Sequence, residues 1–203
     1  MGRWHISRIE ISPDAAMLAN LRYRERSVSP GHYTRLMYDG RVVMSDTDAE
    51  LRDFLQYRHL LHGHVLMNGL GLGVHLGICL MQEMVRKVTV IELAETLIGM
   101  VGEHYQVIAG ENGVSLSIIH GDAFTWRAPV GARFGFVWHD IWPDLSSDNL
   151  PQMTILHRRY GSRCDAQASW GHSECLRARA SEKVENQQYE RWAKVRAAVT
   201  YAE

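Results

Sequence analysis

The feature that most constrains this chain is a short apolar run that breaks into three alternating glycines, the segment Val65–Gly73 (VLMNGLGLG). A compact apolar run of this kind is typical of a buried strand. Glycines at every second position let the chain turn sharply and come close to a ligand, because no Cβ stands in the way. The next segment, Val74–Met81, reads as a helix whose first N–H groups would point at whatever lies over the glycines. We therefore predict a ligand-binding loop at the carboxyl end of a strand.

Strand and helix patterns alternate after this loop. Runs prone to form strands lie at 87–92, 114–119, 134–138 and around 166–170, and helical patterns lie at 93–106 and 150–160. This alternation predicts an α/β, Rossmann-like fold with a mostly parallel sheet and helices on both faces. We find no convincing sixth or seventh strand, so the sheet is expected to end after its fifth strand. A polar helical tail is expected from Ser181 onward.

The N-terminal part has a different pattern. A strand at 6–11 precedes a helix that begins at Pro13, and two β-prone runs at 33–38 and 41–45 flank Asp39-Gly40. Asp-Gly between two such runs is a strong hairpin signal. Asp46 or Thr47 then caps a helix, with Glu50 at the capping-box position. We divide the chain into an N-terminal extension (1–62), a Rossmann-like core (63–160) and a C-terminal strand with a helical tail (161–203).

Composition narrows the classes of function. The chain has 203 residues, 46% of them hydrophobic and 22% charged, and its net charge is -1 with neutral histidines. This charge gives no general attraction to nucleic acid or to a membrane surface. There is no apolar run of about 18 residues and no signal-peptide-like segment, so we expect a cytoplasmic protein. Cys164, His172 and Cys175 lack a fourth ligand with convincing spacing, and no metal site is predicted.

Acidic residues follow three of the predicted strands. Glu92 ends the second strand, Asp122 follows the third, and Asp140 follows the fourth. Ligands of parallel sheets bind beyond the carboxyl ends of the strands, so these acids are candidates for ligand contacts. Each also has a simpler interpretation, because acids are common at helix N-termini and in capping turns. His139 is not expected to pair with its neighbour Asp140, since adjacent strand residues point to opposite faces.

The glycine spacing separates the nucleotide-binding classes. The NAD fingerprint G-x-G-x-x-G fails, because its last glycine would fall on Val74 or on Leu76. The G-x-G-x-G pattern, with an acid about 20 residues later, resembles instead the class I S-adenosylmethionine (SAM)-dependent methyltransferases. One carboxylate can accept hydrogen bonds from both ribose hydroxyls, and a second can accept one from the adenine amino group. The resemblance implies a cofactor site formed by Asn68, Gly69, Leu70, Gly71, Gly73, Glu92, Leu93, Asp122 and Ala123.

A finer resemblance concerns the segment before the glycines. The Asp39-Gly40 hairpin and the helix after it look like the N-terminal part of spermidine synthase-like proteins. Most methyltransferases carry an acid two residues before the first glycine, and spermidine synthase-like proteins lack it. In this chain Met67 stands at that position. In aminopropyltransferases a catalytic Asp follows the fourth strand, where Asp140 stands; the next acid, Asp144, lies one place late. This resemblance implies decarboxylated SAM as an alternative donor. We assign Tyr38, Asp46 and Trp142 to substrate binding.

The leading hypothesis is a SAM-dependent methyltransferase that acts on a small-molecule acceptor, with Asp140 orienting or deprotonating the nucleophile. Aminopropyl transfer is an alternative on the same site. A second class of function is a non-catalytic binding or assembly protein on the same fold, and a third is an NAD oxidoreductase. The hairpin and the terminal helix could also support a homodimer.

Overall fold

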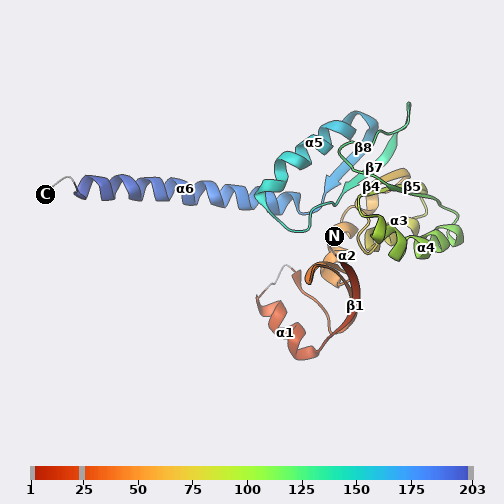
Figure 1. The fold of residues 1–203 in the computed structure, drawn as a ribbon, viewed down its shortest axis with the longest axis horizontal. Coiled ribbons are helices and arrows are strands. Elements are labelled where there is room, and N and C mark those ends of the chain that lie inside the picture. Colours follow the sequence, from red (N-terminus) through yellow and green to blue (C-terminus); the bar gives the residue numbers. More distant parts are fainter. Residues whose placement is uncertain (1–2, 23–25, 201–203) are drawn as a thin grey trace.

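The computed structural model describes residues 3–22 and 26–200. Its strands form two separate sheets, a three-stranded sheet in the order β1-β2-β3 and a five-stranded sheet in the order β6-β5-β4-β7-β8. Figure 1 shows the smaller sheet and its helix α1 as a unit beside the larger one, and a long terminal helix that leaves the body of the molecule.

The N-terminal extension is an antiparallel sheet. Its hairpin turns through Asp39 (φ 47°) and Gly40 (φ 78°), the two left-handed positions that a tight Asp-Gly turn requires. The predicted hairpin is therefore confirmed. The first strand pairs along its whole length with the second, from Trp4 opposite Tyr38 to Ile11 opposite Gly31, which the sequence pattern did not indicate. The elements are β1 (Trp4–Ile11), α1 (Pro13–Arg22), β2 (Gly31–Tyr38) and β3 (Arg41–Ser45).

The sequence pattern extends the helix after the hairpin to about Leu61, but the helix in the structure is shorter. Helix α2 (Asp48–Leu55) is followed by a single 3-10 turn at Arg58–Leu60. Thr47 occupies the N-cap position, but its side chain makes no capping hydrogen bond and contacts the Ser45 hydroxyl instead. The expected capping box is wrong, because the Glu50 carboxylate faces Arg26.

The central sheet is parallel throughout, and its order places β4 in the middle with β5 on one side and β7 on the other. This is the strand order 3-2-1-4-5 of a doubly wound α/β sheet, so the Rossmann-like prediction is confirmed. Within the described residues no strand follows β8, as expected. The elements are β4 (Gly63–Asn68), α3 (Val74–Leu80), β5 (Val85–Glu92), α4 (Glu95–Glu111), β6 (Ser115–His120), β7 (Phe134–His139), α5 (Leu150–Tyr160) and β8 (Cys164–Ser169).

Both faces of this sheet are buried. On one face Val65 and Met67 of β4 belong to the hydrophobic cluster that also holds helices α2, α3 and α4. On the other face Leu66 packs in the cluster built around Met153 and Leu156 of α5. Strands covered on both sides must be apolar at successive positions, which explains the continuous apolar run before the glycines.

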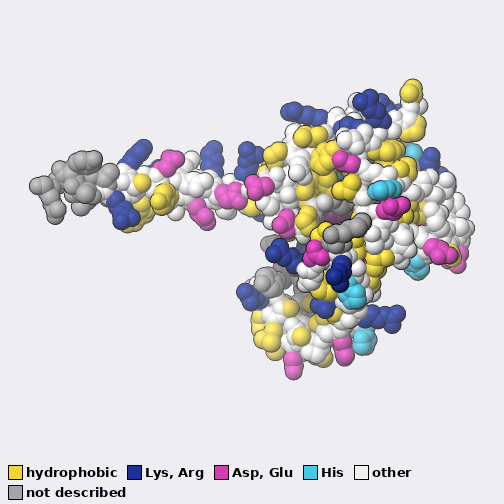
Figure 2. All heavy atoms as spheres, in the orientation of Figure 1, with side chains coloured by type: hydrophobic (Ala, Val, Ile, Leu, Met, Phe, Trp, Pro, Cys, Tyr) yellow, Lys and Arg dark blue, Asp and Glu magenta, His cyan; other side chains and the backbone are white. Residues whose placement is uncertain are grey.

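The terminal helix α6 (His172–Thr200) begins nine residues earlier than its polar pattern suggested. Gly171 (φ 64°) turns the chain after β8, and the buried Cys175 anchors the first turn in the core. The remainder extends away from the sheet and carries charged side chains of both signs (Figure 2). None of the helices in the described ranges, α6 included, has the length and apolar character needed to cross a membrane.

Replacing Gly73 tests how tightly the glycine loop is packed. A Cβ at this position would lie 2.0 Å from the Tyr105 ring, and the backbone φ is 77°. We expect Gly73→Ala to lower the free energy of unfolding by about 2–4 kcal/mol, measured by urea denaturation. Gly99→Ala is the control, because it lies in α4 with open space around its Cβ position, and it should stabilise the protein by about 0.5–1 kcal/mol. Equal effects of the two changes would contradict this packing.

Candidate functional site

The predicted site residues leave the sheet at one edge. In the strand register Asn68 of β4 lies beside Ile91 of β5 and beside His139 of β7, while Glu92 lies beside His120 of β6. The loops after β4, β5, β6 and β7 therefore start at the same level. The strand order reverses direction between β4 and β7. In open α/β sheets, ligands bind at such a reversal, in a crevice between the loops that follow the two strands.

All three alternating glycines have a left-handed backbone, with φ of 101° at Gly69, 53° at Gly71 and 77° at Gly73. Each one also permits close packing by the protein itself. An added Cβ would lie 1.9 Å from the Asp140 carbonyl oxygen at Gly69 and 2.5 Å from the Met44 sulfur at Gly71. At Gly73 it would meet the Tyr105 ring, whose hydroxyl donates to the Leu72 carbonyl oxygen. The glycines thus bring β7, the N-terminal sheet and α4 against the loop.

Met44 joins the N-terminal sheet to the glycine loop. Its sulfur lies 3.4 Å from the Leu72 N–H, which donates to it, and its side chain is buried with Leu36, Leu72 and Leu97. The hairpin therefore lies on the loop itself.

Glu92 fixes the other side of the loop. Its carboxylate accepts the Leu70 N–H at 2.8 Å and the Ala94 N–H at 2.7 Å, and the residue is 8% exposed. Asn68, immediately before the loop, is fully buried and donates from Nδ2 to the His139 ring at 2.8 Å. The predicted cofactor residues of β4 and β5 are thus connected through the backbone of Leu70.

The remaining predicted cofactor residues lie beside this edge. Asp122 accepts the Phe124 N–H at 2.8 Å, so it also caps its own turn. Ala123 is buried, and its carbonyl oxygen accepts the Tyr160 hydroxyl at 3.4 Å. Leu93 is 69% exposed although it follows the buried Glu92. Leu93 thus gives an apolar surface to the segment between β5 and α4.

Asp140 is paired with a histidine that sequence reasoning did not select. Its Oδ2 lies 3.2 Å from Nδ1 of His75, the second residue of α3, and the His75 side chain is 4% exposed. His139 points away, as expected from its strand geometry, and bonds to Asn68 and Gln167. Burial lowers the pKa of His139 to about 3, so its ring is neutral. The one signal for His75 in the sequence is its place as a single polar residue in the apolar helix 74–81.

Glu50 lies on the other side of His75. The His75 Nε2 is 3.4 Å from the Glu50 carbonyl oxygen, and the Glu50 carboxylate lies 3.5 Å from Arg26. Burial raises the pKa of Glu50 to about 7; Arg26 opposes this rise, and the carboxylates of Asp140 and Asp53 add to it.

A small pocket lies next to this cluster, beyond the carboxyl ends of β7 and β8. Arg26 links the cluster of His75, Asp140 and Glu50 to this pocket, since it contacts Glu50 and also bonds to Asp53 at 2.8 Å. Asp53 in turn accepts the Trp170 indole N–H at 3.0 Å. The lining of the pocket includes Arg26, Asp53, Tyr57, Trp170, His172 and Glu174. The pocket is therefore mostly polar, with aromatic walls formed by Tyr57, Trp138 and Trp170.

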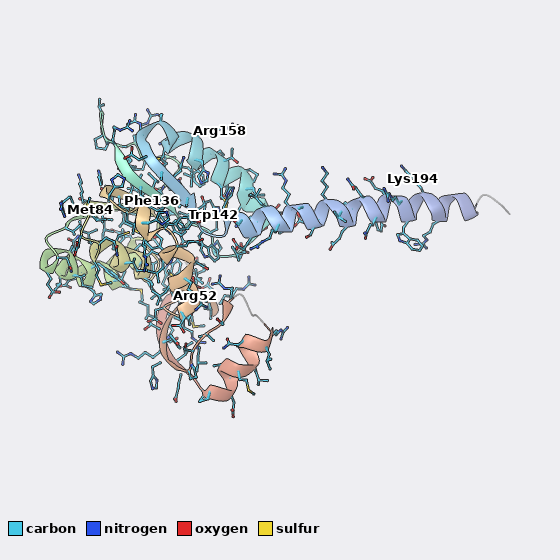
Figure 3. The ribbon with its side chains drawn as sticks, turned by 180° about the vertical axis from the view of Figure 1, so that it is seen from behind. Arg52, Met84, Phe136, Trp142, Arg158 and Lys194 are labelled. Atoms are coloured by element: carbon cyan, nitrogen blue, oxygen red, sulfur yellow. The ribbon has the colours of Figure 1, made fainter. Side chains whose placement is uncertain are left out.

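The three predicted substrate residues do not lie together. Asp46 accepts the Thr34 N–H at 2.6 Å, and its charge adds to the burial that raises the pKa of Tyr105 to about 12. Tyr38 packs its ring on Trp4, with the ring centroids 4.7 Å apart. Trp142 is buried under α5 and donates to Gln152 at 2.7 Å, close to the beginning of α6 (Figure 3). Their role in substrate binding stays a prediction.

Comparison with known proteins found distant structural likenesses. No protein-family model and no curated sequence matches the chain. Among solved structures it is similar to the glycopeptide N-methyltransferase MtfA complexed with sinefungin (18% identity, TM-score 0.41, covering 57% of this chain and 44% of that one). It is also similar to the 23S rRNA methyltransferase ErmE (14%, 0.44, 59% and 44%) and to a SAM-dependent methyltransferase from Clostridium acetobutylicum (10%, 0.41, 58% and 48%). In each case the likeness spans about half the length of the matched protein.

The pKa of Glu50 predicts a pH effect on stability. Glu50 loses its proton near pH 4.5 in the unfolded chain and near pH 7 in the folded one, so its contribution to stability is lost as pH rises through 7. Glu50→Gln stays neutral, and its free energy of unfolding should therefore fall less than that of the wild type between pH 5 and pH 8, by on the order of 2 kcal/mol.

Urea denaturation at both pH values measures this difference. Glu103→Gln, at an exposed position of α4, should keep the wild-type pH dependence. A Glu50→Gln variant with that same dependence would show that Glu50 titrates normally.

Proposed function

We propose that this protein is a SAM-dependent methyltransferase that acts on a small-molecule acceptor. One observation carries the proposal: the Glu92 carboxylate binds the backbone of the glycine loop at the sheet edge where Asp122 and Asp140 also emerge. One edge of the sheet thus carries the left-handed glycine loop together with three acids, which stand at the ends of β5, β6 and β7.

The residues at this edge fit SAM chemically. A carboxylate oxygen can accept two hydrogen bonds, so Glu92 can bind both ribose hydroxyls while it holds Leu70 and Ala94. Asp122 has the same spare capacity for the adenine amino group. Leu93 and Ala123 would contact the adenine ring, and the backbone from Asn68 to Gly73 would face the amino-acid part. The loop contains no Lys or Arg, which suits a cationic sulfonium and not a phosphate.

When bound, the sulfonium supplies an activated methyl group, which is released to a nucleophile with the bond electrons returning to sulfur. Asp140 then has two tasks, to orient the nucleophile and to accept its proton. Because His75 holds Oδ2 of Asp140, the carboxylate has a fixed direction. Most of the rate would come from holding the reactants in line.

We propose that the pocket beyond β7 and β8 binds the part of the acceptor that is remote from its nucleophilic atom, because Asp140 does not line this pocket. Asp53, Tyr57 and Trp170 line it, and Arg26 connects it to the cluster that contains Asp140 through Glu50. The net charge of -1 gives no general attraction to nucleic acid, which favours a small-molecule acceptor.

We further propose that the chain is spermidine synthase-like in architecture. An antiparallel sheet precedes the glycine loop and contacts it through Met44, and Met67 stands two residues before the first glycine. The segment Ile141–Asp144 differs from the aminopropyltransferase pattern, so we favour methyl transfer. The turnover experiment below includes decarboxylated SAM as a second donor, because aminopropyl transfer is the alternative reaction.

Ligand binding tests this proposal. SAM and its demethylated product S-adenosylhomocysteine should both raise the melting temperature of the wild type, and NADH should not. Glu92→Gln should weaken SAM binding about tenfold or more in calorimetry, because a buried carboxylate that accepts hydroxyl donors is lost. Glu95→Gln, an exposed acid three residues later, should bind SAM as the wild type does.

Turnover separates the remaining functions. Formation of S-adenosylhomocysteine over a panel of small amines, alcohols, phenols and thiols would support the methyltransferase. Binding of SAM without turnover of SAM or of decarboxylated SAM over the whole panel would favour a non-catalytic binding protein. Stabilisation by NADH alone would reject the SAM site.

A further inference from the structure

His75 connects three parts of the molecule that are distant in sequence. It lies in α3, directly after the glycine loop, and its Nδ1 faces the Asp140 carboxylate at 3.2 Å. Its Nε2 faces the carbonyl oxygen of Glu50 in α2 at 3.4 Å. One imidazole thus bridges the strand-end acid of β7 and the helix that follows the N-terminal sheet.

The ring is held in one orientation by aromatic neighbours. Phe54 of α2 stacks on it with centroids 4.9 Å apart and planes inclined by 20°, and Trp138 of β7 meets it edge-on at 5.6 Å and 89°. Phe54 and Trp138 are both fully buried. The imidazole therefore cannot swing away from Asp140 without disturbing the core.

Both ring nitrogens of His75 face oxygen acceptors. A neutral imidazole has a single N–H and could donate to only one of them, whereas the imidazolium donates to both. Burial by itself lowers the pKa of His75. The hydrogen bond and the negative charge of Asp140, together with the carbonyl oxygen and the charge of Glu50, outweigh burial, and the pKa is raised. The geometry and the charges together indicate a buried imidazolium–carboxylate pair.

The other charged groups around the pair come from several elements. Glu50 and Asp53 project from α2, and Arg26, which precedes β2, contacts both of them. Glu174 of α6 acts on Arg26 through its charge. Among residues 3–22 and 26–200, Asp140 is the one whose carboxylate lies within hydrogen-bonding distance of the His75 ring.

We propose that His75 is a positioning residue, which fixes the Asp140 carboxylate at the crevice as one half of an imidazolium–carboxylate pair and ties it to both the glycine loop and α2. The role of Asp140 in this inference rests on the proposed function. The pairing itself does not, since it is a property of the free protein.

Two consequences distinguish positioning from packing: the pKa of His75 depends on Asp140 in the free protein, and it responds to the charge of a bound ligand. A buried histidine that only fills the core would not respond to a charge in the crevice. SAM and S-adenosylhomocysteine differ by a methyl group and by the positive charge on sulfur. If the pair faces the transferred methyl group, the cation of SAM should disfavour the imidazolium, so the pKa of His75 should be lower in the SAM complex than in the S-adenosylhomocysteine complex.

NMR of the full chain labelled with 15N-histidine measures both consequences. The ring signals of His75 are assigned by their loss in His75→Gln. In the free wild type we expect both ring nitrogens to carry protons at pH 6, because the pKa is raised above its ordinary value of 6.5, and we expect Asp140→Asn to lower the pKa of His75. In the two complexes we expect the lower pKa with SAM.

His64 is the matched control within the same spectra. It lies at the other end of β4 and bonds to Thr89 at 2.9 Å, and burial together with Lys87 lowers its pKa to about 4. Its ring should stay neutral from pH 6 to 8 and should not respond to Asp140→Asn or to either ligand.

The outcomes are separable. A neutral His75 ring in the free protein at pH 6, or a pKa unchanged by Asp140→Asn, would overturn the pairing. Equal His75 pKa values in the SAM and S-adenosylhomocysteine complexes would overturn its positioning role at the crevice. Failure of both ligands to bind would contradict the proposed function, and with it the role of Asp140, while the free-protein titration would still decide the pairing.

Discussion

The arrangement of the candidate site depends on the buried carboxylate of Glu92. This group accepts two backbone N–H donors, one from the glycine loop at Leu70 and one from Ala94 just before α4. Two charge-assisted hydrogen bonds compensate the cost of burying the charge. They also fix the distance between the ends of β4 and β5, so the loop has a defined position even without a ligand.

Close backbone contacts complete the loop from the other sides. Gly69 lies against the Asp140 carbonyl oxygen, and the Asp140 N–H donates to the Asn68 carbonyl oxygen at 2.8 Å. Met44 covers Gly71 from the N-terminal sheet. The loop thus serves as a junction at which the N-terminal sheet and the central sheet meet, and a change in any of the three contacts would move the crevice.

The acid after β7 is organised by a second set of contacts. His75 extends from α3 to Asp140, while Glu50, Arg26 and Asp53 continue the charged row toward the pocket beyond β7 and β8. Arg26 and Asp53 carry opposite charges in a partly buried environment, where electrostatic interactions are stronger than in water. Helix α3 connects the contacts of the glycine loop with those of Asp140. It begins directly after the loop, and its second residue is His75.

The amino-acid sequence by itself determined the strand that ends at the glycines, the hairpin at Asp39-Gly40, the alternation of strands and helices, and the edge where Glu92, Asp122 and Asp140 emerge. These features depend on local patterns, namely apolar runs, left-handed turn positions and strand ends, and so they can be predicted from neighbouring residues. Only the tertiary structure decided that Asp140 pairs with His75, that Glu50 faces Arg26 instead of capping α2, and that Met44 lies on the glycine loop. Each of these contacts joins elements far apart in the chain, and their partners are fixed by how helices and sheets pack, which no local pattern encodes.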